Sequence, residues 1–253
     1  DGFGFLASDE LQPIAGLTEG LSDNPALADA TAIELSPDQD FAALQLPSGD
    51  VVRLRDDQSF DTVDARAGLI APSVDGFGYV WSVPGAHPTA LVAHAADETA
   101  VDVADAWGGA SRIRAMELSR DGARIVALVD IGSGSEAWVA GVVRDKGVPL
   151  RLGPWMRLAT LPGPGVSVSW LDEATVGIVV SVDGESRIIA QQVGGLASTT
   201  SLQADVVTIA GGSQLSSVRV LASDGTMYLK TGARWQKSAA GILVLATQQG
   251  APQ

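Results

Sequence analysis

The sequence of 253 residues contains no cysteine. This absence excludes disulfide bonds, thiolate metal sites and a cysteine nucleophile, so stability must come from packing and strand pairing. Lacking cysteine is compatible with either side of a membrane. Because 46% of the residues are hydrophobic, the chain can still bury a sizeable core, and disorder is not expected.

Long hydrophobic runs are absent as well. The longest run near the end, Gly241–Ala246, has the length of a strand, whereas a membrane-spanning helix needs about 20 apolar residues. The chain begins at Asp1 with neither an initiator methionine nor a signal-like segment. This start predicts a mature or excised fragment of a longer protein.

Positive charge is scarce in the first part of the chain. Residues 1–105 contain 19 Asp and Glu against 3 Lys and Arg, a net charge of −16, and the remainder contains 11 against 13, a net of +2, which gives the total of −14. Phosphate backbones and anionic headgroups need a basic surface, so nucleic acid and anionic lipid are not expected as ligands. The acidic part is either a solvated surface or a surface for a basic partner.

A repeated hairpin is the main feature that the sequence does contain. Each copy is an apolar strand, a tight turn with Asp or Gly, and a second apolar strand. The copies are Ile33–Asp38 with Phe41–Leu44, Met116–Gly122 with Ile125–Leu128, and Leu69–Trp81, whose second half resembles Asp1–Ala7. Self-similarity at this scale indicates an array of supersecondary units.

The spacing of the repeated turns predicts a β-propeller. If Asp38, Asp75, Asp121, Asp172 and the pair 211–212 are equivalent turns, the steps between them are 37, 46, 51 and 39 to 40 residues. Propeller blades of the WD40 type repeat every ~40–45 residues. The flanking strands are almost continuously apolar, as expected for strands covered on both faces.

The two chain ends supply the pieces of one further blade. Ile242–Leu245 resembles an inner strand without a partner, and Phe3–Ala7 and Gln12–Ala15 resemble outer strands without a start. The predicted fold is therefore an all-β propeller with six four-stranded blades, closed by strands from both chain termini. Rings of five or seven blades remain open, residues 1–253 are expected to form one domain, and a short helical turn is possible in residues 20–31 or 95–112.

Few residues suit catalysis or metal binding. The two histidines, His87 and His94, have no metal-ligand spacing and are interpreted as ordinary loop residues. The acidic pairs lack the pattern of a calcium loop and are interpreted as turn-formers and solvated acids. These pairs are Asp38 with Asp40, Asp56 with Asp57, and Asp102 with Asp105.

Catalytic motifs are also missing. With 30 acidic residues, possible carboxylate pairs for glycoside hydrolysis are too numerous to be informative. There is no nucleophile elbow, phosphate loop or dinucleotide fingerprint, and Gly132–Ser135 is interpreted as a hairpin turn. We therefore predict no catalytic, cofactor-binding or metal-binding residues, no cofactor, and no enzymatic activity.

Two groups of side chains suit contacts with a partner. Basic residues concentrate in the third blade and either contact an acidic partner or keep the rim soluble. They are Arg112, Arg114, Arg120, Arg124, Arg144, Lys146, Arg151 and Arg157. Among the six tryptophans, which include Trp235, we expect Trp81, Trp138 and Trp170 to pack between blades, and Trp107 and Trp155 to be candidate interface anchors.

Three segments resemble a known family. Leu69–Pro84, Met116–Arg124 and Leu245–Gly250 look like the C-terminal β-propeller of the actinobacterial LpqB lipoproteins, and the resemblance covers essentially the whole chain. It implies a fragment of a secreted lipoprotein that is acylated at an N-terminal cysteine and carries a GerMN-type domain before the propeller. It also implies a location outside the cytoplasmic membrane, held by a lipid anchor beyond these residues.

The resemblance further implies a partner. Family members are linked to the extracytoplasmic sensor region of the histidine kinase MtrB, in the MtrA–MtrB two-component system that governs envelope maintenance and division. We therefore expect a non-enzymatic interaction module that binds this sensor region. The alternative is a propeller that binds or processes cell-wall glycan or another small ligand at its central channel. Converging carboxylates with aromatics or a bound ion at the channel would favour the alternative, and a plugged or featureless channel would count against it.

Overall fold

Antiparallel strands, most of them joined by tight turns, make up the described part of the chain in the computed structural model. The structure describes residues 5–7, 11–12, 30–37, 41–55, 59–65, 67–68, 70–95, 101–102, 110–132, 134–211 and 218–245. Within these ranges it contains 24 strands and no helix. No described segment is therefore a helix that could cross a membrane.

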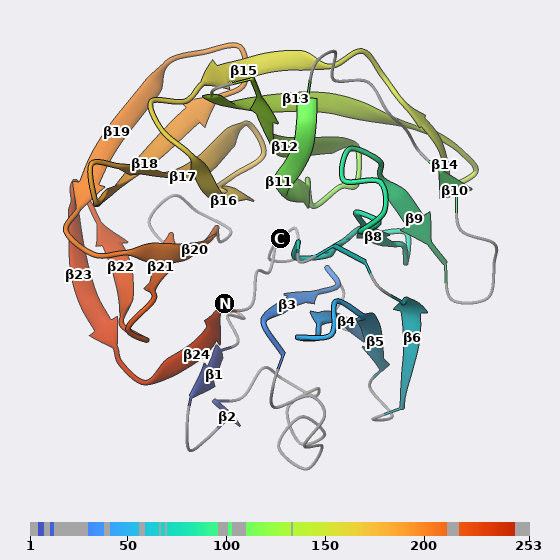
Figure 1. The fold of residues 1–253 in the computed structure, drawn as a ribbon, viewed down its shortest axis with the longest axis horizontal. Helices are drawn as coiled ribbons and strands as arrows, with labels where there is room; N and C mark the ends of the chain where they lie inside the picture. Colours follow the sequence, from blue (N-terminus) through green and yellow to red (C-terminus); the bar gives the residue numbers. More distant parts are fainter. Residues whose placement is uncertain are drawn as a thin grey trace.

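The strands form sheets that follow one another around a ring (Figure 1). Blade 1 contains β3 (Ala32–Leu35), β4 (Phe41–Gln45), β5 (Val51–Arg55) and β6 (Phe60–Asp64). Blade 2 contains β7 (Ser73–Val74), β8 (Val80–Ser82), β9 (Val92–His94) and β10 (Val101–Asp102). Blade 3 contains β11 (Ala110–Leu118), β12 (Arg124–Ile131), β13 (Gly134–Asp145), β14 (Val148–Leu152) and β15 (Met156–Thr160). Blade 4 contains β16 (Gly165–Trp170), β17 (Thr175–Val182), β18 (Glu185–Gln192) and β19 (Ala197–Leu202). Blade 5 contains β20 (Val206–Ala210), β21 (Arg219–Ala222), β22 (Met227–Thr231) and β23 (Arg234–Ala239).

The terminal sheet joins both ends of the chain. It contains β1 (Phe5–Ala7), β2 (Leu11–Gln12) and β24 (Ile242–Leu245), in the order β2-β1-β24. Phe5 lies opposite Leu245 and Leu6 lies opposite Val244 in an antiparallel pair. The predicted pairing of strands from the two ends is therefore confirmed.

The all-β propeller is confirmed, but the prediction of six four-stranded blades is wrong. There are five blades, and the ring is completed by the terminal sheet, which has only three strands in the described residues. Blade 3 has five strands because β13 is 12 residues long and pairs with two strands in succession. Its first part pairs with β15 through Glu136–Val139, and its second part pairs with β14 through Val142–Asp145.

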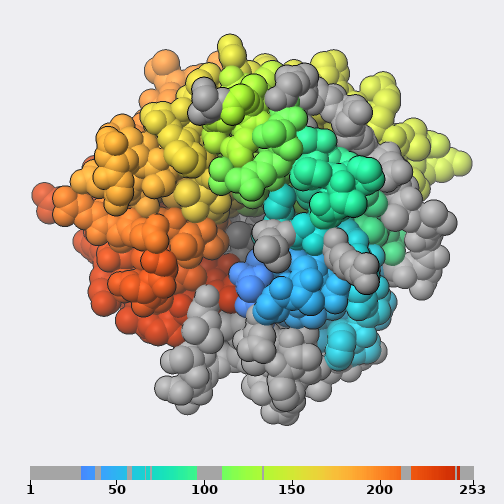
Figure 2. All heavy atoms as spheres, viewed as in Figure 1, coloured from blue at the N-terminus to red at the C-terminus, as the bar shows by residue number. Residues whose placement is uncertain are grey.

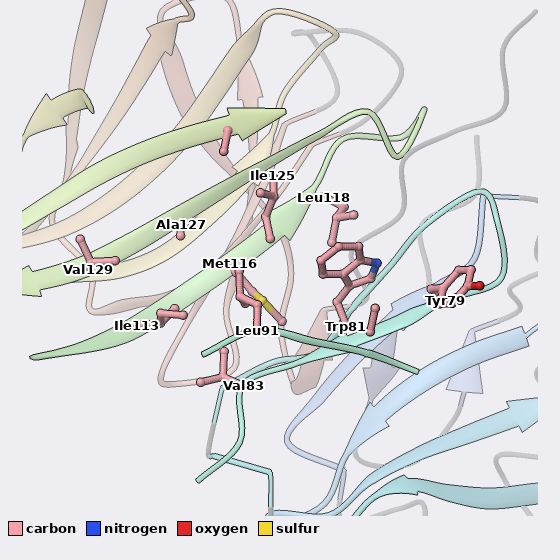
Figure 3. Close-up of a cluster of buried hydrophobic side chains, with 12 residues drawn as sticks. Tyr79, Trp81, Val83, Leu91, Ile113, Met116, Leu118, Ile125, Ala127 and Val129 are labelled. Atoms are coloured by element: carbon pink, nitrogen blue, oxygen red, sulfur yellow. The ribbon is translucent and has the colours of Figure 1, made fainter. Parts of the chain in front are cut away.

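Apolar side chains fill each joint between neighbouring sheets. Six clusters of buried residues each take members from two adjacent sheets. In the joint between blades 2 and 3, Trp81 and Leu91 face Met116 and Leu118 across the gap (Figure 3). The central strands serve two joints because successive side chains point to opposite faces. Ile125 thus packs toward blade 2, whereas Val126 packs toward blade 4.

The first hairpin turns form where the sequence predicts them. The side chain of Asp75 accepts hydrogen bonds from the N–H groups of Phe77 (2.9 Å) and Tyr79 (3.0 Å). Asp121 and Asp172 accept similar bonds from backbone groups two residues further on. Carboxylates that close such turns explain why Asp recurs at these positions. Those turns are confirmed, whereas Asp38 and residue 212 lie outside the described residues, as do residues 20–29, 96–100 and 103–109 of the two predicted helical turns.

Candidate functional site

A cavity lies at the centre of the ring, which is hollowed in the space-filling view (Figure 2). The inner strands β3, β7, β11, β16, β20 and β24 contact one another in turn around it. The cavity has a volume of about 240 Å³. Its polar lining residues include Glu34, Gln45, Arg114, Glu117, Ser167 and Thr208.

Glu34 on β3 connects blade 1 to blade 2. Its Oε1 atom accepts hydrogen bonds from the hydroxyl of Ser73 (3.0 Å) and the N–H of Val74 (3.1 Å) on β7. Glu34 is 6% exposed, and no described residue donates to its other oxygen. Burial raises the pKa of Glu34 well above the ordinary value of 4.5, and the charge of Glu117 raises it further.

Glu117 on β11 repeats the same contact between blades 3 and 4. Its Oε1 atom accepts hydrogen bonds from the hydroxyl of Ser169 (3.1 Å) and the N–H of Trp170 (3.2 Å) on β16. Glu117 is 2% exposed and lines the cavity together with Glu34. The two glutamates thus hold equivalent places in the two most similar repeats.

The two serines extend this chain of contacts to the next blade. Ser73 accepts a hydrogen bond from the N–H of Leu118 (2.9 Å), and Ser169 accepts one from the N–H of Gly211 (3.0 Å). A Cβ at Gly211 would lie 1.9 Å from the carbonyl oxygen of Trp170, so only glycine permits this close approach. We call Glu34, Ser73, Glu117 and Ser169 the inner belt. It links blades 1 to 5 in sequence.

Gln45 at the end of β4 also lines the cavity. The residue is 2% exposed. Neither the nitrogen nor the oxygen of its side-chain amide has a hydrogen-bond partner among the described residues. A buried amide without partners costs roughly 1–3 kcal/mol, so this group is unusual in a folded protein.

A second cavity of about 440 Å³ shares Ile70, Arg114 and Val166 with the first. At its edge, Arg112 and Arg114 both donate to the carboxylate of Asp130, at 2.8 Å and 2.7 Å. Burial raises the pKa of Asp130, but hydrogen bonds from Arg114, Arg112 and Ser135 outweigh it and hold the pKa below its ordinary value. The three charged groups therefore leave one net positive charge beside this second cavity.

The joint between blades 2 and 3 also contains a buried ion pair. Arg144 on β13 contacts Asp75, whose side chain is fully buried and also accepts a hydrogen bond from the indole of Trp81 (2.9 Å). The guanidinium lies 4.4 Å from the centre of the Phe77 ring. Because blade 2 has strands of only two or three residues, the longer β13–β14 hairpin adds contacts that its own strands cannot make.

The two histidines differ from each other. His87 is exposed in a turn, as predicted. His94 is not a loop residue, because the apolar segment around it pairs with β8 as strand β9. Its Nε2 atom lies 2.9 Å from the hydroxyl of Ser82 and 3.5 Å from a carboxylate oxygen of Asp64.

This Ser–His–Asp group does not have the geometry of a hydrolase triad. In a triad the serine and the carboxylate contact different ring nitrogens, whereas here both lie at Nε2. Ser82 is fully buried and donates directly to Asp64. Burial raises the pKa of Asp64, but hydrogen bonds with His94 and Ser82 outweigh it and lower the pKa overall. The group joins blade 1 to blade 2.

The structure divides the predicted basic cluster among internal contacts. The ion pairs of Arg112, Arg114 and Arg144 are described above. In addition, Arg157 forms an ion pair with Glu136 (3.2 Å), and the guanidinium of Arg124 lies 4.9 Å from the ring centre of Trp170. Lys146 and Arg151 on the β13–β14 hairpin are exposed. Internal pairing thus accounts for most of this cluster, and a contact with an acidic partner stays a prediction.

The tryptophans mostly follow expectation. Trp81, Trp138 and Trp170 pack in clusters between blades, as predicted. Trp155 is half-buried against the same cluster as Trp81, and its role as an interface anchor stays a prediction. Trp107 lies outside the described residues.

Metal-binding predictions are only partly covered by the structure. The described residues bring together no group of three or more His, Cys, Asp or Glu side chains that could hold a metal ion. Asp38, Asp40, Asp56, Asp57 and Asp105 lie outside the described residues, and Asp102 belongs to β10. For a ligand-binding channel we expected converging carboxylates together with aromatic residues. Two carboxylates converge at the channel, but no aromatic residue is among the described residues that line it.

Comparison with known proteins gives one family and a common fold. A model of the family described as the lipoprotein LpqB β-propeller domain matches residues 6–243. No curated protein sequence matches the chain. Among solved structures, the Cps50 (Swd1) β-propeller domain of Myceliophteria thermophila is similar, with 10% identity, a TM-score of 0.53, and coverage of 83% of this chain and 71% of that one. The Dos1 propeller is similar at 10% identity and a TM-score of 0.53, and the match covers 87% of this chain but only 58% of that one. At this identity the two structures show the fold alone.

Proposed function

The chain belongs to the family of LpqB lipoprotein β-propeller domains, and from this premise we propose that it is a non-enzymatic, extracytoplasmic interaction module. In this proposal a membrane-anchored lipoprotein carries the domain, and the domain binds the sensor region of a histidine kinase of the MtrA–MtrB type. By this contact it modulates signalling in envelope maintenance and division.

The observation that carries the proposal is the extent of the family match. The matched residues 6–243 run from β1 into β24 and so include every sheet of the ring. The whole scaffold, and not one blade, therefore defines the family. Six apolar joints and the inner belt make such a scaffold rigid, which suits a platform for another protein.

Binding alone would not modulate a kinase. A partner that binds both signalling states of the kinase equally does not change the equilibrium between them. The domain must therefore bind one state more tightly than the other. The proposal therefore predicts two results: measurable affinity for the purified sensor region, and a change in kinase autophosphorylation when the lipoprotein is present.

The test uses the complete lipoprotein and the kinase reconstituted in vesicles. Calorimetry measures binding to the sensor region, and autophosphorylation is followed with and without the lipoprotein. A lipoprotein that lacks residues 1–253 is the matched control and should lose both effects. Absence of binding at high micromolar concentrations, with both proteins folded, would overturn the proposal.

A further inference from the structure

The central cavity combines features that its structural role in the inner belt leaves unexplained. Glu34 uses one carboxylate oxygen for blade 2, and no described residue donates to the other. Glu117 adds a second carboxylate to the same cavity. Gln45 adds a buried amide with no partner at either polar atom among the described residues. Three potential acceptors thus face one space of about 240 Å³.

The charge in this cavity favours a positive occupant. Two buried carboxylates near each other destabilise their ionised forms, and a cation between them removes that penalty. Arg114 also lines the cavity, but its guanidinium donates to Asp130 at 2.7 Å. Arg114 shares this carboxylate with Arg112, so the cavity lining itself carries two glutamates against one arginine.

The residues that line the central cavity do not suit a bare metal ion. Calcium takes six to eight oxygen ligands, and magnesium demands near-octahedral oxygen geometry. Much of the lining is aliphatic, including Ile33, Val168, Val207 and Val244. The cavity is also smaller than the ~300–1,000 Å³ typical of drug-sized ligands, so it suits a small molecule or a single side chain.

We propose that the central cavity binds a primary ammonium group on a short aliphatic chain. The ammonium has three donors and no acceptor, which matches acceptors on Glu34, Glu117 and Gln45. The aliphatic stem lies against the apolar walls. A free alkylamine or diamine and the lysine side chain of a bound polypeptide offer the same chemistry. This proposal does not depend on a kinase partner.

The test measures ligand binding to the folded domain by calorimetry and NMR. The probes are 1-aminopentane, its neutral counterpart 1-pentanol, and a short peptide ending in lysine with its α-carboxyl and α-amino groups blocked. We expect the amine to bind and pentanol to bind at least about tenfold more weakly, because a charge-assisted hydrogen bond contributes more than a neutral one. Binding of the peptide as well would indicate a polypeptide source, and binding of the free amine alone would indicate a small molecule.

Three substitutions separate binding from folding. Glu34→Gln and Glu117→Gln keep an acceptor for the neighbouring blade but remove a charge, so each should weaken amine binding about tenfold or more. Gln45→Leu removes the unpartnered amide and should weaken binding while preserving or raising the melting temperature. Glu185→Gln, at an exposed position on β18, is the matched control and should leave binding unchanged.

Two results would overturn the proposal. One is equal binding of amine and pentanol, or of amine to the wild type and to Glu34→Gln. The other is no binding of either amine probe at roughly 10 mM, well above the range of a weak specific site. If Gln45→Leu stabilises the domain but amine binding is absent, the unpartnered amide is a structural defect and not part of a site.

Discussion

Neighbouring sheets meet in two different ways around the ring. From blade 1 to blade 5 the inner strands are linked by the inner belt in addition to apolar packing. Among the described residues the belt does not continue to the terminal sheet, because the position that Glu117 holds in blade 3 is held in blade 5 by Ala210, whose side chain has no acceptor. The described side chains of this joint are apolar and include Leu221, Met227, Ile242 and Leu245.

The two kinds of joint have different weaknesses. A polar joint fixes which strand follows which, because its donors and acceptors must meet with defined geometry, but it depends on protonation and on complete pairing. An apolar joint is insensitive to pH but depends on how well its volume is filled. The predictions below test this contrast.

The largest effect is expected from Asp75→Ala in the joint between blades 2 and 3. The change leaves the buried Arg144 without its carboxylate partner and removes the acceptor of three further donors, so unfolding free energy should fall by about 3–5 kcal/mol. Chemical denaturation measures this loss. Asp172→Ala is the control: within the described part of the chain, Asp172 accepts from backbone groups of its own turn alone, and its loss should cost about 1 kcal/mol. Equal losses in both variants would contradict a role for the ion pair.

In the apolar joint, Ile242→Ala should reduce unfolding free energy by about 3 kcal/mol, because it leaves a cavity against Leu221 and Met227. Denaturation at several pH values should show the same loss at each, since the substitution removes no titrating group. Leu196→Ala, at a side chain that is 88% exposed, should change stability by less than about 0.5 kcal/mol. If the stability loss of Ile242→Ala depended strongly on pH, the apolar joint would not differ from the polar joints in the way proposed.

Glu117→Ala in the polar joint should cost about 2 kcal/mol, since the hydroxyl of Ser169 and the N–H of Trp170 lose their acceptor. Glu117→Gln keeps an oxygen acceptor and should cost less. A double-mutant cycle with Ser169→Ala measures the coupling, which should be favourable. Additive losses would mean that the two side chains do not stabilise this joint together.

The smallest effect concerns pH. The folded-state pKa of Glu34 lies above the ordinary value of 4.5, so its contribution to stability is fully present below that value and is lost as pH rises through the folded pKa. Glu34→Gln should therefore flatten the decline in stability above about pH 4.5. Melting temperatures across this range, compared with those of Glu185→Gln, measure the difference. An unchanged slope would show that Glu34 does not titrate in this way.

Much of the fold could be predicted because its units are local in sequence. The turns at Asp75, Asp121 and Asp172 each lie between two short apolar segments that pair with each other. Strands from the two ends were expected to pair because each lacked a neighbour. The fifth strand of blade 3 was missed, because nothing in the sequence of β13 shows that one strand changes partners along its length.

The candidate site could not be predicted, although its signal was present. Glu34 and Glu117 recur at the same position of two similar repeats, each as a charged residue within an apolar strand. Their partners Ser73 and Ser169 lie about 40 and 50 residues further along the chain, so only the closed ring brings them together. His94 shows the same limit, since Asp64 comes from a different blade.

The pairing of β1 with β24 also sets an order of events in time. Each blade can form from strands that are close in sequence, but Phe5 meets Leu245 only after the intervening blades have brought the two ends together. Contacts between distant segments form slowly, because loop closure costs entropy before any contact is gained. Until that moment the newly made propeller is an open arc with bare strand edges, which other chains can join. For this protein, the stage before ring closure therefore leaves strand edges open to aggregation and to strand exchange between molecules.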